Sequence, residues 1–190
     1  MTTLEVKTFL GTLQDQVSGE TLAALSAISD QLTLPKGTAL MEEGKLYDCF
    51  YILVRGSAKA FRWKDGEISC SWFAFENDVL ATMGALDGQI SDETIELLED
   101  STLIKINLNA FTHLAEHNLA VARLGFHWLA EHTKFLGQQV ELHTLSSRDR
   151  YEKITAAHPE LLQRVSLTDL ASFLGMRRET LSRVRGKAGI

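Results

Sequence analysis

The stretch that decides the architecture lies near the C-terminus, where residues 166–184 read SLTDLASFLGMRRETLSRV. Ser166 followed by Asp169 is typical of a helix start, because both side chains can bond free backbone N–H groups there. Apolar residues then recur at helical spacing and give the helix one buried face: Leu167, Leu170, Ala171 and Leu174. Gly175 permits the positive φ of a tight turn, and Leu181 and Val184 give a second helix its buried side. The stretch therefore predicts two short helices that cross steeply, a helix-turn-helix.

The outer face of the second helix carries groups suited to a DNA major groove. It comprises Arg177, Arg178, Glu179, Thr180, Ser182 and Arg183. Arginine can form a bidentate pair with guanine, glutamate can accept from cytosine, and the hydroxyl groups suit phosphate oxygens. The alternative is an ordinary helical hairpin with a charged exterior, which has a similar composition. The helix-turn-helix spacing and the surplus of basic residues together favour a DNA-binding motif, with double-stranded DNA as the partner.

Charge is divided unequally along the 190 residues, a length that suits one large or two small domains. Residues 1–145 contain 10 Lys and Arg against 20 Asp and Glu, whereas residues 146–190 contain 9 against 5. An acidic body with a basic tail indicates a polyanion-binding module joined to a second function.

The first half of the chain reads as a helix followed by many short strands. Residues 4–31 are helical in pattern, and Asn109 is a candidate cap for a short helix after the strands. Between them, Asp65-Gly66 separates two β-prone runs and predicts a hairpin. Further runs of strand formers lie at 32–34, 39–41, 49–54, 58–63, 68–75, 79–80, 94–98 and 102–106. Short strands without crossover helices predict an α+β chain with an antiparallel β barrel or jelly roll.

A heptad seam follows the strands. Its residues alternate at spacings of three and four: Leu119, Ala122, Phe126, Leu129, Thr133, Leu136, Val140 and His143. The seam can pack against the chain's own barrel or against a second copy. We expect the second arrangement, because Leu124, Trp128 and Phe135 offer another apolar face to the barrel. The expected dimer interface is Leu119, Ala122, Phe126, Leu129, Leu136 and Val140.

These patterns divide the chain into three parts. Residues 1–118 form a sensor domain, residues 119–145 a long dimerisation helix, and residues 146–190 the DNA-binding domain. Ser146 to Asp149 interrupts the seam and starts a new helix, expected at 149–157 and ended by His158-Pro159.

The chain resembles the Crp/Fnr-type transcription regulators over nearly its whole length. In the barrel the resemblance rests on Lys36-Gly37, Glu43-Gly44 and residues 48–56 (DCFYILVRG), and in the tail on residues 178–183 (RETLSR). It implies a cyclic-nucleotide-binding-like barrel, a dimer helix and a helix-turn-helix. By the resemblance Arg178, Glu179 and Arg183 match the base-reading triplet, and RNA polymerase is a candidate partner. The family's β-hairpin wing has no counterpart before Ile190, which predicts docking with fewer backbone contacts.

The ligand site departs from the family pattern. Where the resemblance implies a Gly-Glu pair and an arginine for a cyclic nucleotide, this chain has Ala81-Thr82 and Asp92-Glu93. The 40 residues between Lys64 and Lys105 include ten acids and no Lys or Arg. A buried phosphate without a paired cation is costly, although backbone amides at 82–84 could hold an anion. We expect an unknown neutral small-molecule effector, or none, and not a cyclic nucleotide. The candidate pocket residues are Leu80, Ala81, Thr82, Met83, Asp92 and Glu93.

Other classes of protein are disfavoured. Cys49 and Cys70 are too few for a zinc or iron–sulfur site and should be buried, and no cofactor is expected. His113 and His117 could share a metal but lack a third ligand, so we expect solvent-facing side chains and no metal site. No strand carries a histidine and no nucleophile elbow occurs, which argues against an enzyme. No apolar run approaches the roughly 18–20 residues of a membrane span, and a signal peptide is absent, so we expect a cytoplasmic protein that binds no membrane.

The sequence thus predicts a homodimeric, sequence-specific DNA-binding transcription regulator of the Crp/Fnr type. The alternative is a cyclic-nucleotide or small-molecule binding protein with a vestigial DNA-binding tail.

Overall fold

The structure is a computed structural model that describes residues 18–64 and 66–187. The chain divides into two units, Met1–Ala60 with Phe73–Leu129, and Phe61–Trp72 with Ala130–Ile190. The strands are β1 (Ser29–Leu34), β2 (Ala39–Met41), β3 (Cys49–Arg55), β4 (Ala58–Lys64), β5 (Glu67–Ala74), β6 (Val79–Leu80), β7 (Thr94–Leu97) and β8 (Ser101–Asn107). The described helices are α2 (Gly19–Ala27), α3 (Met83–Leu86), α4 (Leu108–His117), α5 (Leu119–Thr144), α6 (Ser147–Ala157), α7 (Leu161–Arg164), α8 (Leu167–Phe173) and α9 (Arg178–Lys187).

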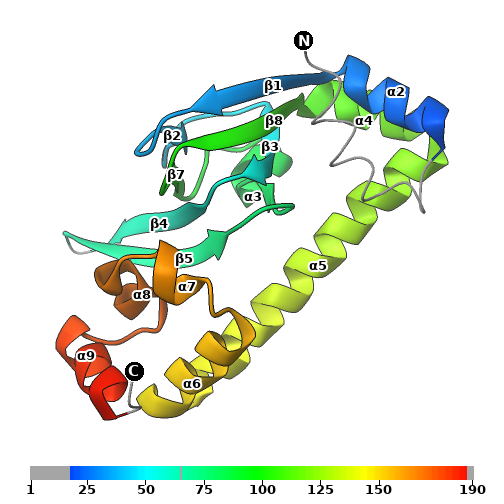
Figure 1. Cartoon of the computed structure of the whole chain (residues 1–190). Helices are drawn as coiled ribbons and strands as arrows, with labels where there is room; N and C mark the ends of the chain where they lie inside the picture. The colour runs from blue at the N-terminus through cyan, green and yellow to red at the C-terminus, as the bar shows by residue number, and fades with distance from the viewer. Residues whose placement is uncertain (1–17, 65, 188–190) are drawn as a thin grey trace. The chain divides into compact units, whose positions relative to one another are not determined.

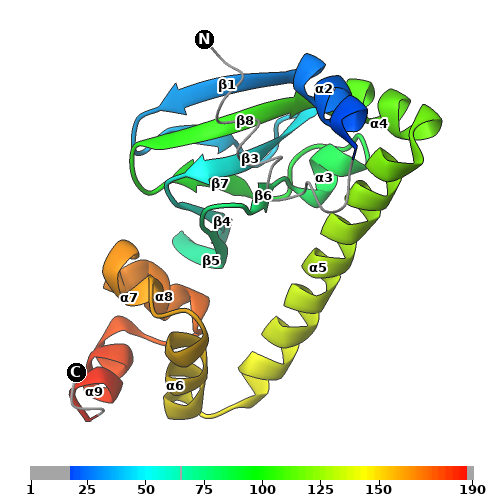
Figure 2. The same cartoon turned by 45° about the vertical axis from the view of Figure 1, so that its right-hand side comes forward.

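The strands form two four-stranded sheets (Figures 1 and 2). The first has the order β1-β8-β3-β6 and the second β2-β7-β4-β5. β8 pairs antiparallel with both β1 and β3, with Leu103 opposite Leu32 on one side and Leu53 on the other. Antiparallel sheets with flanking helices, a long helix and further C-terminal helices confirm the predicted fold class.

The main apolar core joins the first sheet to the helices that follow it. Phe50 of β3 meets Phe111 of α4 edge-to-face, with ring centroids 5.3 Å apart, and Trp128 of α5 stacks on Phe111 at 5.8 Å. The other buried members of the cluster are Leu25 of α2, Ile52, Ile104, Ile106, Val121 and Leu124. Cys49 and Cys70 are both buried, as predicted. The start of α5 is therefore held to the barrel by its inner apolar side.

The predicted helix over 4–31 is wrong at its C-terminal end. Ser18 caps α2, which ends at Ala27, and from Ser29 the chain is a strand paired with β8. Ile28 and Leu32 continue the helical spacing, but the unpaired edge of β8 offers backbone hydrogen bonds that a longer helix would forgo. Residues 4–17 lie outside the described residues.

A second correction concerns the helix after β8. Asn107, not Asn109, caps α4, because its Oδ1 atom accepts a hydrogen bond from the amide of Ala110 at 3.0 Å. Asn109 is instead an exposed residue inside the first turn. The strand and the helix follow without a spacer, so the cap lies at the last strand residue.

Candidate nucleic-acid interface

Helices α8 and α9 form the pair predicted from residues 166–184. Ser166 Oγ accepts a hydrogen bond from the backbone amide of Asp169 at 3.0 Å and donates one to the carboxylate of the same residue at 2.7 Å. These two bonds fix the start of α8. The helix is followed by Gly175 at a φ of +62°, and α9 begins at Arg178. Leu170, Ala171, Phe173, Leu174 and Leu181 are buried between the helices of this unit. Local capping and one glycine thus produce the tight connection.

The six residues predicted to contact DNA lie together on the turn and the first part of α9. Arg177, Arg178, Glu179, Ser182 and Arg183 are exposed, and Thr180 is half-buried. Within the described residues, these six side chains make one hydrogen bond, a long one from Arg183 Nε to the carbonyl of Glu179 at 3.4 Å. Because Leu181 is fully buried beneath them, the orientation of this basic surface is set by packing. The surface presents three guanidinium groups near the start of one helix.

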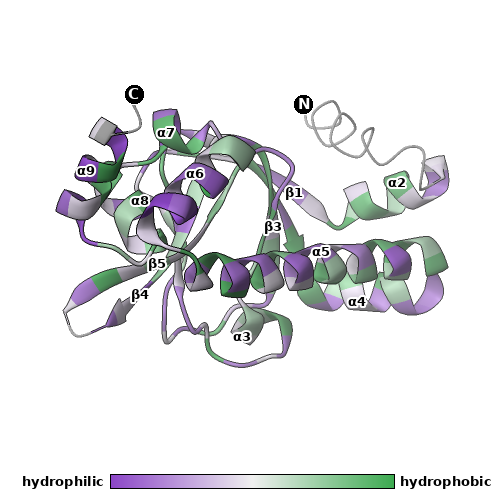
Figure 3. Ribbon diagram, turned by 90° about the horizontal axis from the view of Figure 1, so that it is seen from below, coloured by the Kyte–Doolittle hydropathy of each residue, from purple (hydrophilic) through white to green (hydrophobic). Residues whose placement is uncertain are grey.

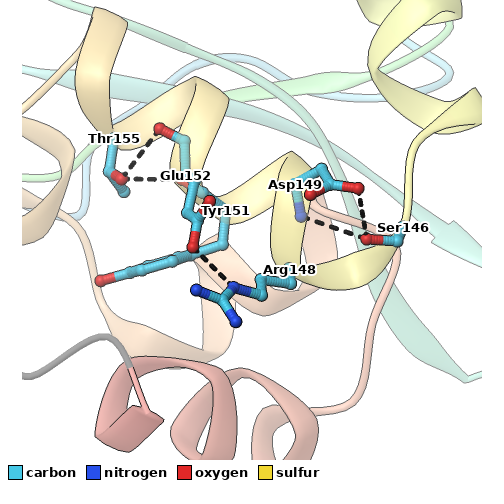
Figure 4. A network of polar contacts seen from close by, with 6 residues as sticks. All are labelled: Ser146, Arg148, Asp149, Tyr151, Glu152 and Thr155. Atoms are coloured by element: carbon cyan, nitrogen blue, oxygen red, sulfur yellow. Dashed lines mark hydrogen bonds and ion pairs between the residues drawn. The ribbon is translucent and has the colours of Figure 1, made fainter.

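Helix α6 supports the pair from beside α9. Ser146 caps it by accepting the amide of Asp149 and donating to its carboxylate, and Arg148 makes an exposed ion pair with Glu152 at 2.7 Å (Figure 4). Hydrogen bonding to Glu152 raises the pKa of Arg148. Tyr151 is buried, and within the described residues its hydroxyl group has no hydrogen-bond partner. The helix starts at Ser147, two residues before the predicted Asp149, because Ser146 provides the cap.

Helix α5 has a buried side and an exposed apolar side. Leu124 is buried and Trp128 is half-buried in the core cluster, and burial lowers the pKa of the half-buried His132. Phe135 is also half-buried. Hydrophobic and hydrophilic residues alternate along the helix in Figure 3. On the opposite side Phe126 is 75% exposed and Val140 71% exposed. Leu119, Leu129 and Leu136 are exposed there too, and Ala122 is half-buried.

The predicted ligand-site residues come from two adjoining segments. A Cβ atom on Gly84 would lie 2.0 Å from the carbonyl oxygen of Ile90, so α3 and the loop before β7 are in close contact. Leu80 and Thr82 are buried, Ala81 is half-buried, and Met83 and Asp92 are exposed. The hydroxyl group of Thr82 caps α3 by accepting the amide of Ala85 at 3.2 Å. Glu93 is buried, with 7% of its surface exposed, so one of the candidate pocket residues is a buried acidic side chain.

Sequence reasoning missed a buried cation in the same unit. Lys59 of β4 is 8% exposed, and its Nζ atom lies 3.7 Å from Glu96 Oε1 on neighbouring β7. The only signal in the sequence is a lysine inside the apolar run 58–63. The charge of Lys59 is therefore already balanced by a carboxylate of the protein itself.

The histidine pair belongs to α4, in the first unit. His113 and His117 are exposed on α4, as predicted, with ring centroids 4.9 Å apart. His117 Nδ1 lies 2.9 Å from the carbonyl of His113, which a protonated ring nitrogen satisfies. No group of three or more potential metal ligands occurs in the described ranges. Among the same residues, none of the helices combines the length and apolarity needed to cross a bilayer.

The chain is similar to known proteins in one domain and in its fold. Residues 31–118 match the family described as cyclic nucleotide-binding domain. No curated protein sequence matches the chain. The c-di-GMP responsive global regulator CLP of Xanthomonas campestris is 19% identical with a TM-score of 0.71, covering 90% of this chain and 92% of its own.

Two further solved structures have a similar fold. A transcriptional regulator of the crp/fnr family from Eubacterium rectale is 16% identical with a TM-score of 0.68, covering 90% of this chain and 83% of its own. The catabolite activator protein of Thermus thermophilus is 21% identical with a TM-score of 0.58, covering 93% and 85%. Residues 31–118 therefore resemble cyclic nucleotide-binding domains, and the chain shares its fold with solved Crp/Fnr-type regulators.

Proposed function

We propose that the chain is a homodimeric, sequence-specific DNA-binding transcription regulator of the Crp/Fnr type. The observation that carries the proposal is the basic surface of the turn and the start of α9, where Arg177, Arg178 and Arg183 are exposed and Leu181 is buried. Arg178 and Glu179 lie in the first turn of the helix, the part of a recognition helix that reaches base edges. In this role Arg178, Glu179 and Arg183 read bases, while Arg177, Thr180 and Ser182 contact phosphates.

Dimerisation is supported by the exposed seam of α5. Large apolar side chains seldom remain in water at heptad spacing over a helix of 26 residues unless they have a partner. A second copy of α5 packed in parallel would bury Phe126, Leu129 and Val140 of both chains. The two α9 helices would then enter successive major grooves, about 34 Å apart.

The effector is proposed to be a small molecule other than a cyclic nucleotide. Ala81 and Thr82 replace the Gly-Glu pair, and Glu93 adds a buried carboxylate at the expected phosphate position. Lys59, the buried cation of this unit, is already paired with Glu96. Binding of the effector would favour one orientation of the reading helices, as a shift between pre-existing conformations. The activity is regulatory, not enzymatic, in line with the matched domain and folds.

The test is selection of bound sequences from a random duplex pool with the full chain, with and without a metabolite mixture. The expected result is a two-fold symmetric sequence, bound with an affinity that falls linearly on a log–log plot as salt rises. Enrichment of no sequence under either condition, together with salt-independent retention, would reject the DNA-reading role.

A second candidate is a small-molecule binding protein whose tail no longer binds DNA. The observation that favours it is the confinement of the family match to residues 31–118, which leaves out α8 and α9. Under this alternative the metabolite mixture raises the melting temperature of the protein, while duplex DNA has no effect at low salt. Our proposal predicts that DNA stabilises the protein as well, because any ligand of the native state does so.

A further inference from the structure

A single arginine of α6 bonds the ends of two other helices. Arg150 Nε donates to the carbonyl of Leu145 at 3.1 Å, and Arg150 Nη1 donates to the carbonyl of Leu174 at 2.6 Å. Leu145 directly follows the last residue of α5, and Leu174 is the C-cap of α8. All three residues belong to the second unit. One side chain thus joins the end of the proposed dimer helix to the turn before the reading helix.

The chemistry of the guanidinium group makes this connection stiff. The last carbonyl groups of a helix lack intrahelical partners and carry partial negative charge, so a cation there is favourable. Arginine stays charged, and its N–H donors lie in one rigid plane. Two carbonyl groups bonded to the same plane are therefore fixed relative to each other. A lysine ammonium has three donors that rotate on a flexible stem, so it does not hold two carbonyl groups in one fixed plane.

The turn itself is packed against the same group. A Cβ atom on Gly175 would lie 3.1 Å from Arg150 Nη1 and 3.4 Å from His143 Nδ1. His143 is in the last turn of α5. The Gly175 backbone therefore lies close to both the arginine of α6 and the last turn of α5, and α9 starts three residues later.

We propose that Arg150 is a positioning residue that sets the orientation of α9 relative to the end of α5, and thereby the separation of half-sites that the dimer accepts. Arg150 makes no base contact in this role. Its contribution appears in the spacing between half-sites and not in the bases read within each one. The inference rests on the proposed DNA-binding function.

The test measures binding of the full chain to duplexes that hold the selected half-site fixed and vary the spacer one base pair at a time. The wild type is expected to prefer one spacing. In Arg150→Met and Arg150→Lys, the ratio of affinity for the preferred spacer to affinity for the other spacers should fall about tenfold. This is close to the contribution of one charged hydrogen bond. Both should keep the base preference within a half-site and the dimer mass in light scattering.

Arg148→Met is the matched control, because it removes the same charge from the same helix and breaks only an exposed ion pair with Glu152. It should keep the wild-type spacing preference. If Arg150→Lys behaves as the wild type, charge alone suffices and the rigid connection is wrong, whether or not Arg150→Met folds. If the wild type binds no duplex, the proposed function fails instead.

Discussion

At the scale of single residues, Arg178 is the most informative side chain of the basic surface. It is the first residue of α9, is exposed, and forms no ion pair within the described residues. An arginine that stabilises its own fold is normally paired or packed over apolar surface. Its position is better explained by a partner outside the chain.

Replacing Arg178 by alanine should reduce discrimination between the selected operator and a single-base variant by about 1–3 kcal/mol, because a bidentate arginine–guanine pair is lost. Competition mobility shifts measure this quantity. Arg148→Ala serves as the control for the loss of one positive charge. An unchanged base preference in Arg178→Ala would remove this residue from the base-reading role.

Gly175 is the residue at which the backbone geometry is most demanding. Its φ of +62° disfavours any side chain with a Cβ atom, and Arg150 lies close to where that atom would be. Gly175→Ala should lower the free energy of unfolding by about 1–2 kcal/mol. Urea denaturation followed by circular dichroism measures the change.

Gly137→Ala is the counterpart on α5, where nothing lies within 4 Å of the added atom. There alanine should raise the free energy of unfolding by up to about 1 kcal/mol, because glycine is a poor helix former. Equal effects of the two substitutions would show that the turn does not need glycine.

At the scale of elements, α5 presents two apolar sides with different partners. On one side Trp128 meets Phe50 and Phe111 in the core, and on the other side the large apolar residues from Leu119 to Val140 are exposed. We expect two copies of this helix to associate through the exposed side, because its apolar residues recur at heptad spacing.

Leu129→Asp should therefore produce monomers and weaken operator binding, because a carboxylate in the seam would be buried next to its own copy. Light scattering with size-exclusion chromatography measures the mass. Gln138→Asp, at an exposed position of the same helix away from the seam, should remain dimeric. A dimer of normal mass for Leu129→Asp would contradict the assigned interface.

The hairpin of β4 and β5 has its own connection to α8. β5 is the last strand of its sheet, so its outer backbone groups lack a neighbouring strand. Ser172 Oγ accepts the amide of Cys70 at 2.9 Å and donates to the carbonyl of Ile68 at 2.8 Å. One hydroxyl group thus bonds the backbone N–H of Cys70 and the carbonyl of Ile68, the two groups that a further strand would otherwise bond.

Ser172→Ala should leave both backbone groups of β5 without that partner. The amide of Cys70 is then expected to exchange with deuterium about tenfold faster, equivalent to roughly 1–1.5 kcal/mol of local stability. Hydrogen-exchange mass spectrometry of the peptide containing Cys70 measures it. Ser182→Ala, on the exposed face of α9, should leave this exchange rate unchanged.

At the scale of the whole molecule, charge separates the two proposed activities. The barrel carries a 40-residue stretch free of Lys and Arg, whereas the tail is basic. If both proposed activities hold, we expect the ligand of the barrel to lack the negative charge of the polyanion that the tail binds.

Cyclic AMP and cyclic GMP should fail to bind the full chain at millimolar concentration, because Glu93 is buried beside the expected phosphate position and Lys59 is paired with Glu96. Isothermal titration calorimetry tests this expectation. Saturable heat with one ligand per chain would show that a cation or backbone amides compensate the phosphate charge.

Much of the local structure was predictable because its causes lie within a few residues of each other. The limits of β3, β4 and β6 follow from runs of strand formers, and the ends of β4 and β5 from Asp65-Gly66. The capping serines at 146 and 166 each bond an aspartate three residues later. The exposed residues of α9 were likewise predicted from helical spacing alone.

What only the tertiary structure decided depends on segments far apart in the chain. β8 made a strand of residues 29–31 that the periodicity assigned to a helix, and β7 brought Glu96 to Lys59. Arg150 bonds a residue 24 positions away, and Ser172 bonds residues 102 and 104 positions away. Spacing in a sequence encodes hydrogen bonds and faces within one helix or turn. Which distant backbone groups remain free for a side chain is settled only when the elements pack.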